Sequence, residues 1–133
     1  MCHFNEKYFF AFGGKALKEG TKVGEIVQPF DFVSKVEVYD CERAVWKVIN
    51  YISESTKLRL INPASFQVTG KKIIIFGGAK PLDSTQSTFA TDCGQKVTLS
   101  NETLFFNVSS GEIVRGPDLS KPAYFISGGY IFP

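Results

Sequence analysis

The chain has 133 residues, of which 44% are hydrophobic and 14% aromatic, enough apolar material for one core. Its 15 basic and 13 acidic residues are mixed along the sequence and leave a net charge of +2, which gives no reason to expect a nucleic-acid or membrane surface. No apolar run reaches a transmembrane length, and we expect no secretory signal because polar residues follow Met1. Cys2, Cys41 and Cys93 lack the spacing of metal ligands, so we expect reduced thiols and a cytoplasmic protein.

The chain begins with a predicted strand pair. Residues 2–4 are expected to be the end of one strand, residues 5–7 a polar turn, and residues 8–12 a second strand. The run over 8–12 is rich in Phe, too short for a helix, and typical of a strand buried on both faces. Gly13 and Gly14 follow directly, and glycines there let the backbone take positive φ values and approach a neighbouring segment closely.

A long loop is predicted over residues 15–34, with an apolar tip at Phe30 and Phe32. Alternation of apolar and polar residues then predicts a hairpin with strands over 35–40 and 45–51. The polar run that starts at Asp40 is expected to close this hairpin as a tight turn.

Residues 52–62 are predicted to connect this unit to a second one of the same design. The second unit has a strand over 63–68, a turn, an apolar strand that ends in Gly77 and Gly78, a polar loop over 79–101 and a hairpin over 102–115. Residues 122–125 repeat the pattern of 63–66, so the start of a further unit is predicted over 122–133.

The two units match position by position, which indicates an internal repeat. Phe12 aligns with Phe76, which places Cys2 at the position of Phe66. On the hairpins, Tyr39 corresponds to Phe106, Asp40 to Asn107 and Trp46 to Ile113.

This repeat resembles the kelch family, in which a strand, a glycine pair, a loop, an aromatic residue followed by Asp, and a later Trp recur in each unit. The first unit carries the pattern in Gly13, Gly14, Tyr39, Asp40 and Trp46. The second carries Gly77, Gly78 and Phe106, but has Asn107 in place of the acid and Ile113 in place of the Trp. The resemblance implies an all-β fold, a β-propeller of four-stranded antiparallel blades in which these glycines and rings are structural and the rings fill the space between blades.

The whole chain, residues 1–133, then forms a single kelch-repeat region. Blade one covers about residues 1–51, blade two about 63–115, and a further blade starts at 122. Because propellers close with roughly four to eight blades, we expect an incomplete propeller. It is a fragment of a longer protein, the interpretation we favour, or further copies of the chain or another subunit supply the missing blades.

In this topology the long connections gather on one end of the blades, where recognition residues tend to lie. The resemblance implies a non-catalytic scaffold that binds other proteins, and the candidate contacts are Phe30, Phe32, Lys57 and Arg59. The alternatives are that the two rings pack on their own blade and that the two cations are solvated. No residue is expected to bind a cofactor or metal, since His3 is the single histidine and no carboxylate pair has catalytic spacing.

Two other functions stay open. Some kelch-like propellers are copper oxidases, so the chain could be part of a galactose-oxidase-like enzyme whose ligands lie elsewhere, because one histidine cannot supply them. The other alternative is an architectural subunit of a larger assembly, such as a cytoskeletal one.

Overall fold

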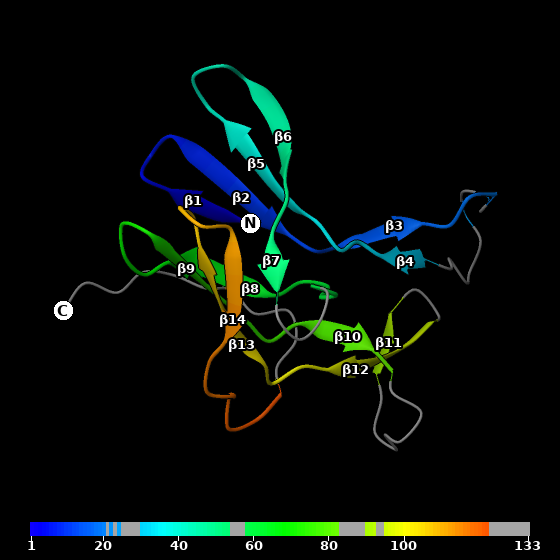
Figure 1. Ribbon diagram of the computed structural model, residues 1–133. Coiled ribbons are helices and arrows are strands. Elements are labelled where there is room, and N and C mark those ends of the chain that lie inside the picture. The colour runs from blue at the N-terminus through cyan, green and yellow to red at the C-terminus, as the bar shows by residue number, and fades with distance from the viewer. Residues whose placement is uncertain are drawn as a thin grey trace.

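The structure, a computed structural model, describes residues 1–20, 22, 24, 30–53, 58–82, 90–92 and 95–122. All regular structure in these residues is β, which confirms the expected class (Figure 1). No helix occurs in these ranges, and so none that is long and apolar enough to cross a membrane.

Two antiparallel four-stranded units form the body of the molecule. The first sheet has the order β1 (Cys2–Phe4), β2 (Tyr8–Phe12), β5 (Val36–Asp40), β6 (Val45–Ile49). The second sheet contains β8 (Ala64–Gln67), β9 (Lys72–Phe76), β13 (Thr103–Asn107) and β14 (Glu112–Arg115) in that order. An unforeseen short strand, β7 (Ile52–Ser53), adds to the second sheet by pairing in parallel with β14.

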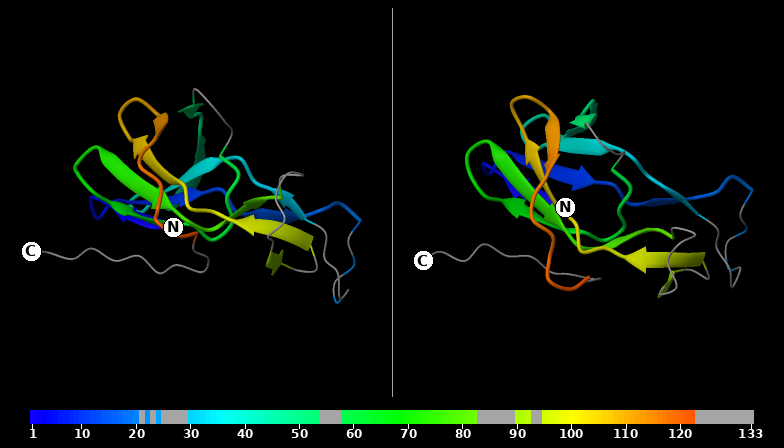
Figure 2. Two further views of the ribbon diagram at one scale, coloured as in Figure 1. Left: turned by 90° about the horizontal axis from the view of Figure 1, so that it is seen from below. Right: turned by 60° about the horizontal axis from the view of Figure 1, so that its bottom comes forward.

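Each sheet continues into a smaller ribbon beyond its glycine pair. The first ribbon pairs β3 (Lys15–Leu17) with β4 (Phe30–Phe32), and the second has the order β10 (Ala79–Pro81), β12 (Gln95–Leu99), β11 (Ala90–Asp92). The expectation of long loops over 15–34 and 79–101 was therefore wrong at the residues of these five strands. The sheets lie together on one side of the molecule, and both ribbons extend to the other (Figures 1 and 2).

A small apolar cluster explains why these ribbons form. Phe30, Ile61, Ala79 and Val97 are buried together, and Phe32 packs against them. Phe30 and Val97 hold equivalent places, since Phe30 pairs with Leu17 on one ribbon and Val97 with Pro81 on the other. The sequence predicts Phe30 and Phe32 as an apolar tip, but Val97 lies in a mostly polar stretch, so the cluster was not predicted.

The register confirms the predicted repeat to the residue. Phe9 pairs with Tyr39 and Tyr39 with Trp46 in the first sheet. In the second sheet, Ile73 pairs with Phe106 and Phe106 with Ile113. The inner strands agree as well, because Cys2 pairs with Phe10 just as Phe66 pairs with Ile74.

The hairpin turns are also the same in both units. Asp40 Oδ1 accepts hydrogen bonds from the backbone N–H groups of Glu42 and Arg43 at 3.0 and 3.2 Å. Asn107 Oδ1 accepts from Ser109 and Ser110 at 2.9 and 3.1 Å. Asn replaces Asp at no cost in geometry here, because the turn needs only a short side chain with an acceptor oxygen.

Both glycine pairs hold the same segment, residues 58–63, which we call the linking segment. Gly14 donates its N–H to the Leu60 carbonyl at 2.7 Å, and Ile61 and Ala79 exchange two backbone hydrogen bonds of 2.8 Å. A methyl group on Gly13 would lie 2.5 Å from the Leu60 carbonyl oxygen, and one on Gly78 2.5 Å from that of Ile61. These glycines also have φ values of +65° and +82°, so both expected roles of the glycine pairs are confirmed.

The main core lies between the two sheets and centres on Phe106. The Phe106 ring lies 5.8 Å from that of Phe10 and 5.5 Å from that of Phe12, measured between centroids, and Phe106 has no exposed surface. At the inner edge, Asn5 and Gln67 exchange two hydrogen bonds, of 3.0 Å to Gln67 Oε1 and 2.8 Å to Asn5 Oδ1. These contacts fix how the first sheet lies on the second.

Trp46 is not part of this core. Its ring contacts Tyr39 at 5.2 Å between centroids, on the face of the first sheet that is turned away from the second, and Trp46 is 51% exposed. The equivalent Ile113 is buried in the cluster that the two sheets share. The described residues thus form two blade-like units and no closed propeller, and the further unit predicted over 122–133 lies outside them except for residue 122.

We expect Phe106→Ala to lower the free energy of unfolding by roughly 3–5 kcal/mol, because it empties the centre of the core. The equivalent change Tyr39→Ala should cost only about 0.5–1.5 kcal/mol, the range for loss of one exposed aromatic contact. Urea unfolding, at a protein concentration where dilution no longer changes the midpoint, measures both. Equal losses would contradict the assignment of the covered face.

We expect Gly78→Ala to destabilise the fold more than Gly20→Ala does. Both glycines have similar φ values, +82° and +84°, but only Gly78 has backbone atoms where a Cβ would lie. Each substitution carries a backbone cost of about 1–2 kcal/mol, and the collision with the Ile61 carbonyl should add roughly 1–3 kcal/mol at Gly78. Urea midpoints of the two variants test this, and equal midpoints would show that the linking segment yields freely.

Candidate functional site

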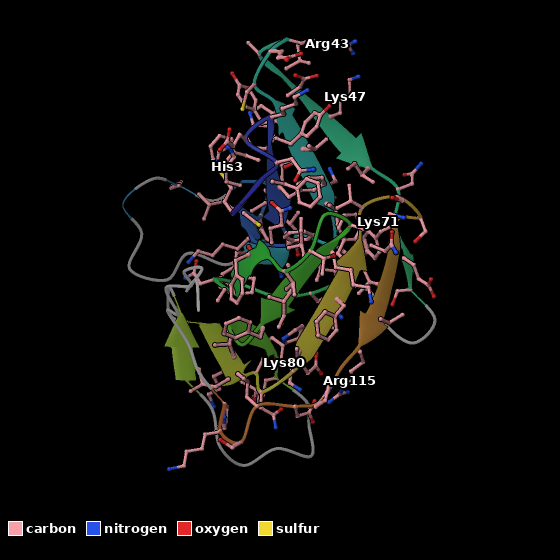
Figure 3. The ribbon with its side chains drawn as sticks, turned by 90° about the vertical axis from the view of Figure 1, so that its left-hand side faces the viewer. His3, Arg43, Lys47, Lys71, Lys80 and Arg115 are labelled. Atoms are coloured by element: carbon pink, nitrogen blue, oxygen red, sulfur yellow. The ribbon has the colours of Figure 1, made fainter. Side chains whose placement is uncertain are left out.

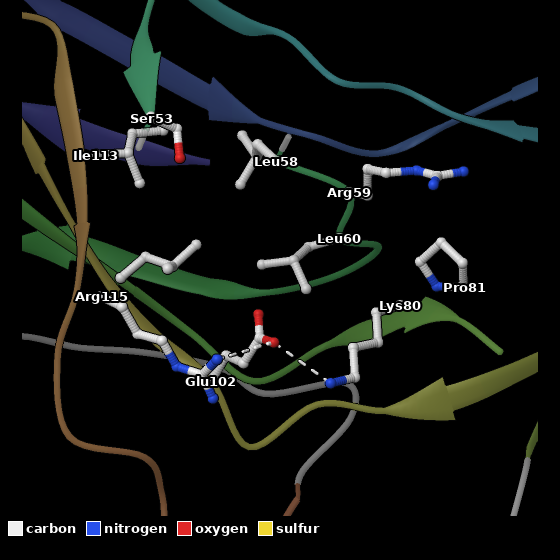
Figure 4. Close-up of a pocket in the computed structure, with 10 residues that line it drawn as sticks. Ser53, Leu58, Arg59, Leu60, Lys80, Pro81, Glu102, Ile113 and Arg115 are labelled. Atoms are coloured by element: carbon white, nitrogen blue, oxygen red, sulfur yellow. Dashed lines mark hydrogen bonds and ion pairs between the residues drawn. The ribbon is translucent and has the colours of Figure 1, made fainter. Parts of the chain in front are cut away.

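A cavity of about 250 Å³ opens at the end of the second sheet where the long connections gather (Figure 4). Its lining comes from β7, the linking segment, β10 and the adjoining ends of β13 and β14. The apolar part of the wall consists of Leu58, Leu60, Pro81, Leu104 and Ile113, and the polar part of Ser53, Arg59, Lys80, Glu102 and Arg115. The sequence predicted that residues for partner recognition lie at this end of the repeat units.

Glu102 is the centre of the charged side of the cavity and lies between two cations (Figure 4). Lys80 Nζ donates to Glu102 Oε1 at 3.3 Å, and Arg115 Nη1 lies 3.8 Å from the same oxygen. Arg115 also donates to both carboxylate oxygens of Asp118, at 2.9 and 3.0 Å from Nη2. The hydrogen bonds with Asp118, and next the charge of Glu102, raise the pKa of Arg115, which keeps it cationic.

Arg59 and Phe32, both predicted as partner contacts, are brought together by the fold. The Arg59 guanidinium lies 5.8 Å from the centroid of the Phe32 ring, at cation–π distance. Arg59 is exposed, Phe32 is half-buried, and among the described residues no carboxylate pairs with Arg59. Arg59 is therefore the cation at the cavity with most freedom to meet an incoming acidic group.

The other two predicted contacts do not join them on the surface. Phe30 is only 1% exposed. It packs against Phe32 and belongs to the apolar cluster with Ile61, Ala79 and Val97, called the ribbon cluster below, so its ring is buried and does not face a partner. Lys57 lies outside the described residues.

Sequence reasoning missed Lys80, Glu102 and Arg115. They are far apart in sequence, and each is an ordinary surface residue by type. The signal available was positional: Lys80 follows a glycine pair, Glu102 precedes β13, and Arg115 ends β14, so all three belong to the same end of one blade-like unit. Figure 3 shows Lys80 and Arg115 near each other at that end, with Arg43 and Lys47 far away on the β5–β6 hairpin.

The structure also places His3 and two of the three cysteines. The ring of His3 stacks on that of Phe9 at 4.6 Å. In the described ranges, no three His, Cys, Asp or Glu side chains gather where they could hold a metal ion. Cys41 is an exposed free thiol and Cys2 a buried one, while Cys93 lies outside the described residues.

The cavity is thus amphipathic, with three cations and one carboxylate on its polar side. Such a lining can accept an apolar side chain and hold an acidic group at its rim. Compared with known protein families and with curated proteins, the chain matches none of them.

We expect iodoacetamide to modify Cys41 well before Cys2 in the folded protein. Burial raises the pKa of the Cys2 thiol from 9.0 to about 11, so only about one Cys2 thiol in a thousand is ionised at pH 8. Modification of Cys2 should accelerate about tenfold per pH unit up to that pKa and become fast in urea. Peptide mass spectrometry follows both sites, and equal rates at pH 8 would show that Cys2 is accessible.

Proposed function

We propose that this chain is a non-catalytic protein-interaction module built on kelch-type repeats. The support for the kelch-type assignment is the pairing of two equivalent four-stranded units, each with a glycine pair after its second strand and the same Asx turn in its outer hairpin. The module offers a rigid frame from which the connections at one end reach a partner.

The observation that carries the proposal is the amphipathic cavity at that end. We assign to it a peptide segment of the partner in which an apolar side chain enters the cavity and a neighbouring acidic residue pairs with Arg59. Leu58, Leu60 and Ile113 are each 5% exposed or less, so they form a fixed apolar floor. Arg59 is attached to the same linking segment and stands at the rim (Figure 4).

The size of the cavity favours a peptide over a metabolite. Pockets for small molecules and cofactors usually measure roughly 300–1,000 Å³ and enclose most of the ligand. At about 250 Å³, this cavity suits one or two side chains of a segment whose backbone stays outside.

Fluorescence anisotropy with three labelled peptides of equal length tests this function. The first places Leu beside Asp and Glu, the second places Leu beside Lys and Arg, and the third replaces the Leu of the first by Ser. We expect only the first to bind, with an affinity that falls as salt is raised, because the contact at Arg59 is exposed to solvent.

Arg59→Glu should weaken binding of the acidic peptide by at least about tenfold, since attraction at the rim becomes repulsion. Arg43→Glu is the matched control: it makes the same charge change at the opposite end, where Arg43 is exposed and lies 3.9 Å from Asp40. Equal affinity for all three peptides, or equal loss in both variants, would contradict the proposed site.

A structural role in a larger assembly is the second candidate. The observation that favours it is the exposed aromatic surface around Trp46, far from the cavity on the outer strand of the first sheet. A soluble peptide that fits the cavity would displace a recognition partner but would leave such an assembly intact.

A further inference from the structure

The first sheet carries an aromatic row on the face turned away from the second sheet, which we call the open face. His3 pairs with Phe9, Phe9 with Tyr39, and Tyr39 with Trp46, so four aromatic side chains stand side by side across all four strands. Trp46 is 51% exposed and Val48, two residues along the same strand, is 56% exposed. The outer hairpin that carries them extends beyond the second sheet in both views (Figures 1 and 3).

The second repeat has an equivalent row of side chains, and in that repeat the row is covered. Ile73, Phe106 and Ile113 occupy the positions of Phe9, Tyr39 and Trp46, with the same pairing across the strands. They are at most 5% exposed: Phe10 and Phe12 of the first sheet contact Phe106, and Ile73 and Ile113 are buried in the same cluster. One row of the repeat is thus buried by a neighbouring sheet, and its equivalent is uncovered.

The surface that does the covering also occurs twice. In the first sheet it consists of Phe10, Phe12, Val36 and Val38, which share one face by strand alternation. The same register gives the second sheet Ile74, Phe76, Thr103 and Phe105 at the equivalent positions. On this surface, the far face of the second sheet, Ile74, Phe76 and Phe105 are partly buried and Thr103 is buried, while Val114 beside Phe105 is 45% exposed.

We propose that a second copy of this chain docks head to tail, with its far face on the open face of the first copy. The contact inside the molecule is the template, because both of its halves recur, in equivalent register, on opposite outer faces. One charged residue interrupts the match, since Glu37 stands where the second repeat has Leu104. Leu104 is only partly buried and lines the cavity, so this position lies at the edge of the packed surface.

Two different surfaces meet in this contact, so the interface is heterologous and leaves a free surface at each end of a pair. Further copies can add until the ring closes. The described residues of each copy form two four-stranded units, and propellers close with roughly four to eight blades, so roughly two to four copies complete a ring. The docking surface is separate from Arg59 and the cavity, so this inference and the proposed function can fail independently.

Native mass by light scattering after size exclusion tests the inference first. We expect the wild-type chain to give a discrete mass of two to four times 14.8 kDa. Trp46→Lys should weaken self-association by at least about 30-fold, because it removes an aromatic contact at the centre of the interface, and the variant should be a monomer. Val45→Lys is the matched control, since Val45 is 41% exposed on the same strand but points to the other side of the sheet.

Complementation distinguishes head-to-tail docking from a symmetric dimer. Ile74→Lys on the far face should also give a monomer, and Val114→Lys, at an exposed site of that face, serves if the first variant does not fold. Mixing Trp46→Lys with either far-face variant should restore one intact contact and give a species of twice 14.8 kDa. A monomeric wild type, an assembly that survives Trp46→Lys, or a mixture that stays monomeric overturns the inference.

Discussion

The packing of Phe106 against Phe10 and Phe12 is the contact on which the rest of the structure depends. It buries the central row of the second sheet under the first and sets the distance between them. At that distance the linking segment passes between the two glycine pairs, where the Leu60 and Ile61 carbonyls occupy the space that Cβ atoms would need. The same segment supplies Ile61 to the ribbon cluster and Leu58 and Leu60 to the cavity, so sheets, ribbons and cavity share one backbone constraint.

The strands, their register and their turns could be predicted from the sequence because they depend on local patterns. Alternation placed Tyr39 and Trp46 on one face, the glycine pairs marked where β2 and β9 end, and Asp40 and Asn107 marked equivalent turns. The ribbons could not be predicted, because they depend on contacts of Phe30 and Val97 with Ile61, which is distant from both in sequence. The cavity was missed for the same reason: Lys80, Glu102 and Arg115 meet only after the second sheet has formed.

Burial, unlike register, does not follow from residue type within the repeat. Trp46 matches the kelch pattern better than Ile113 does, yet Ile113 is buried and Trp46 is half-exposed. The difference comes from what lies over each sheet, since a blade-like unit has two apolar faces and needs a neighbour on both. A sequence repeat therefore predicts which faces are apolar, and the structure is needed to show which of them is covered.

The two repeats share the residues that pack and differ in the residues that line the cavity. Apolar side chains recur at the packing positions, such as Phe10 with Ile74 and Phe12 with Phe76. At the cavity, by contrast, Lys80, Glu102 and Arg115 correspond to Ala16, Lys35 and Val48 in the first repeat, which cannot form the same ion cluster. A general requirement of the fold explains the shared positions but not the charged cluster. The ion cluster is specific to one end of the second unit, which supports the proposed division between recognition at the cavity and assembly through the faces of the sheets.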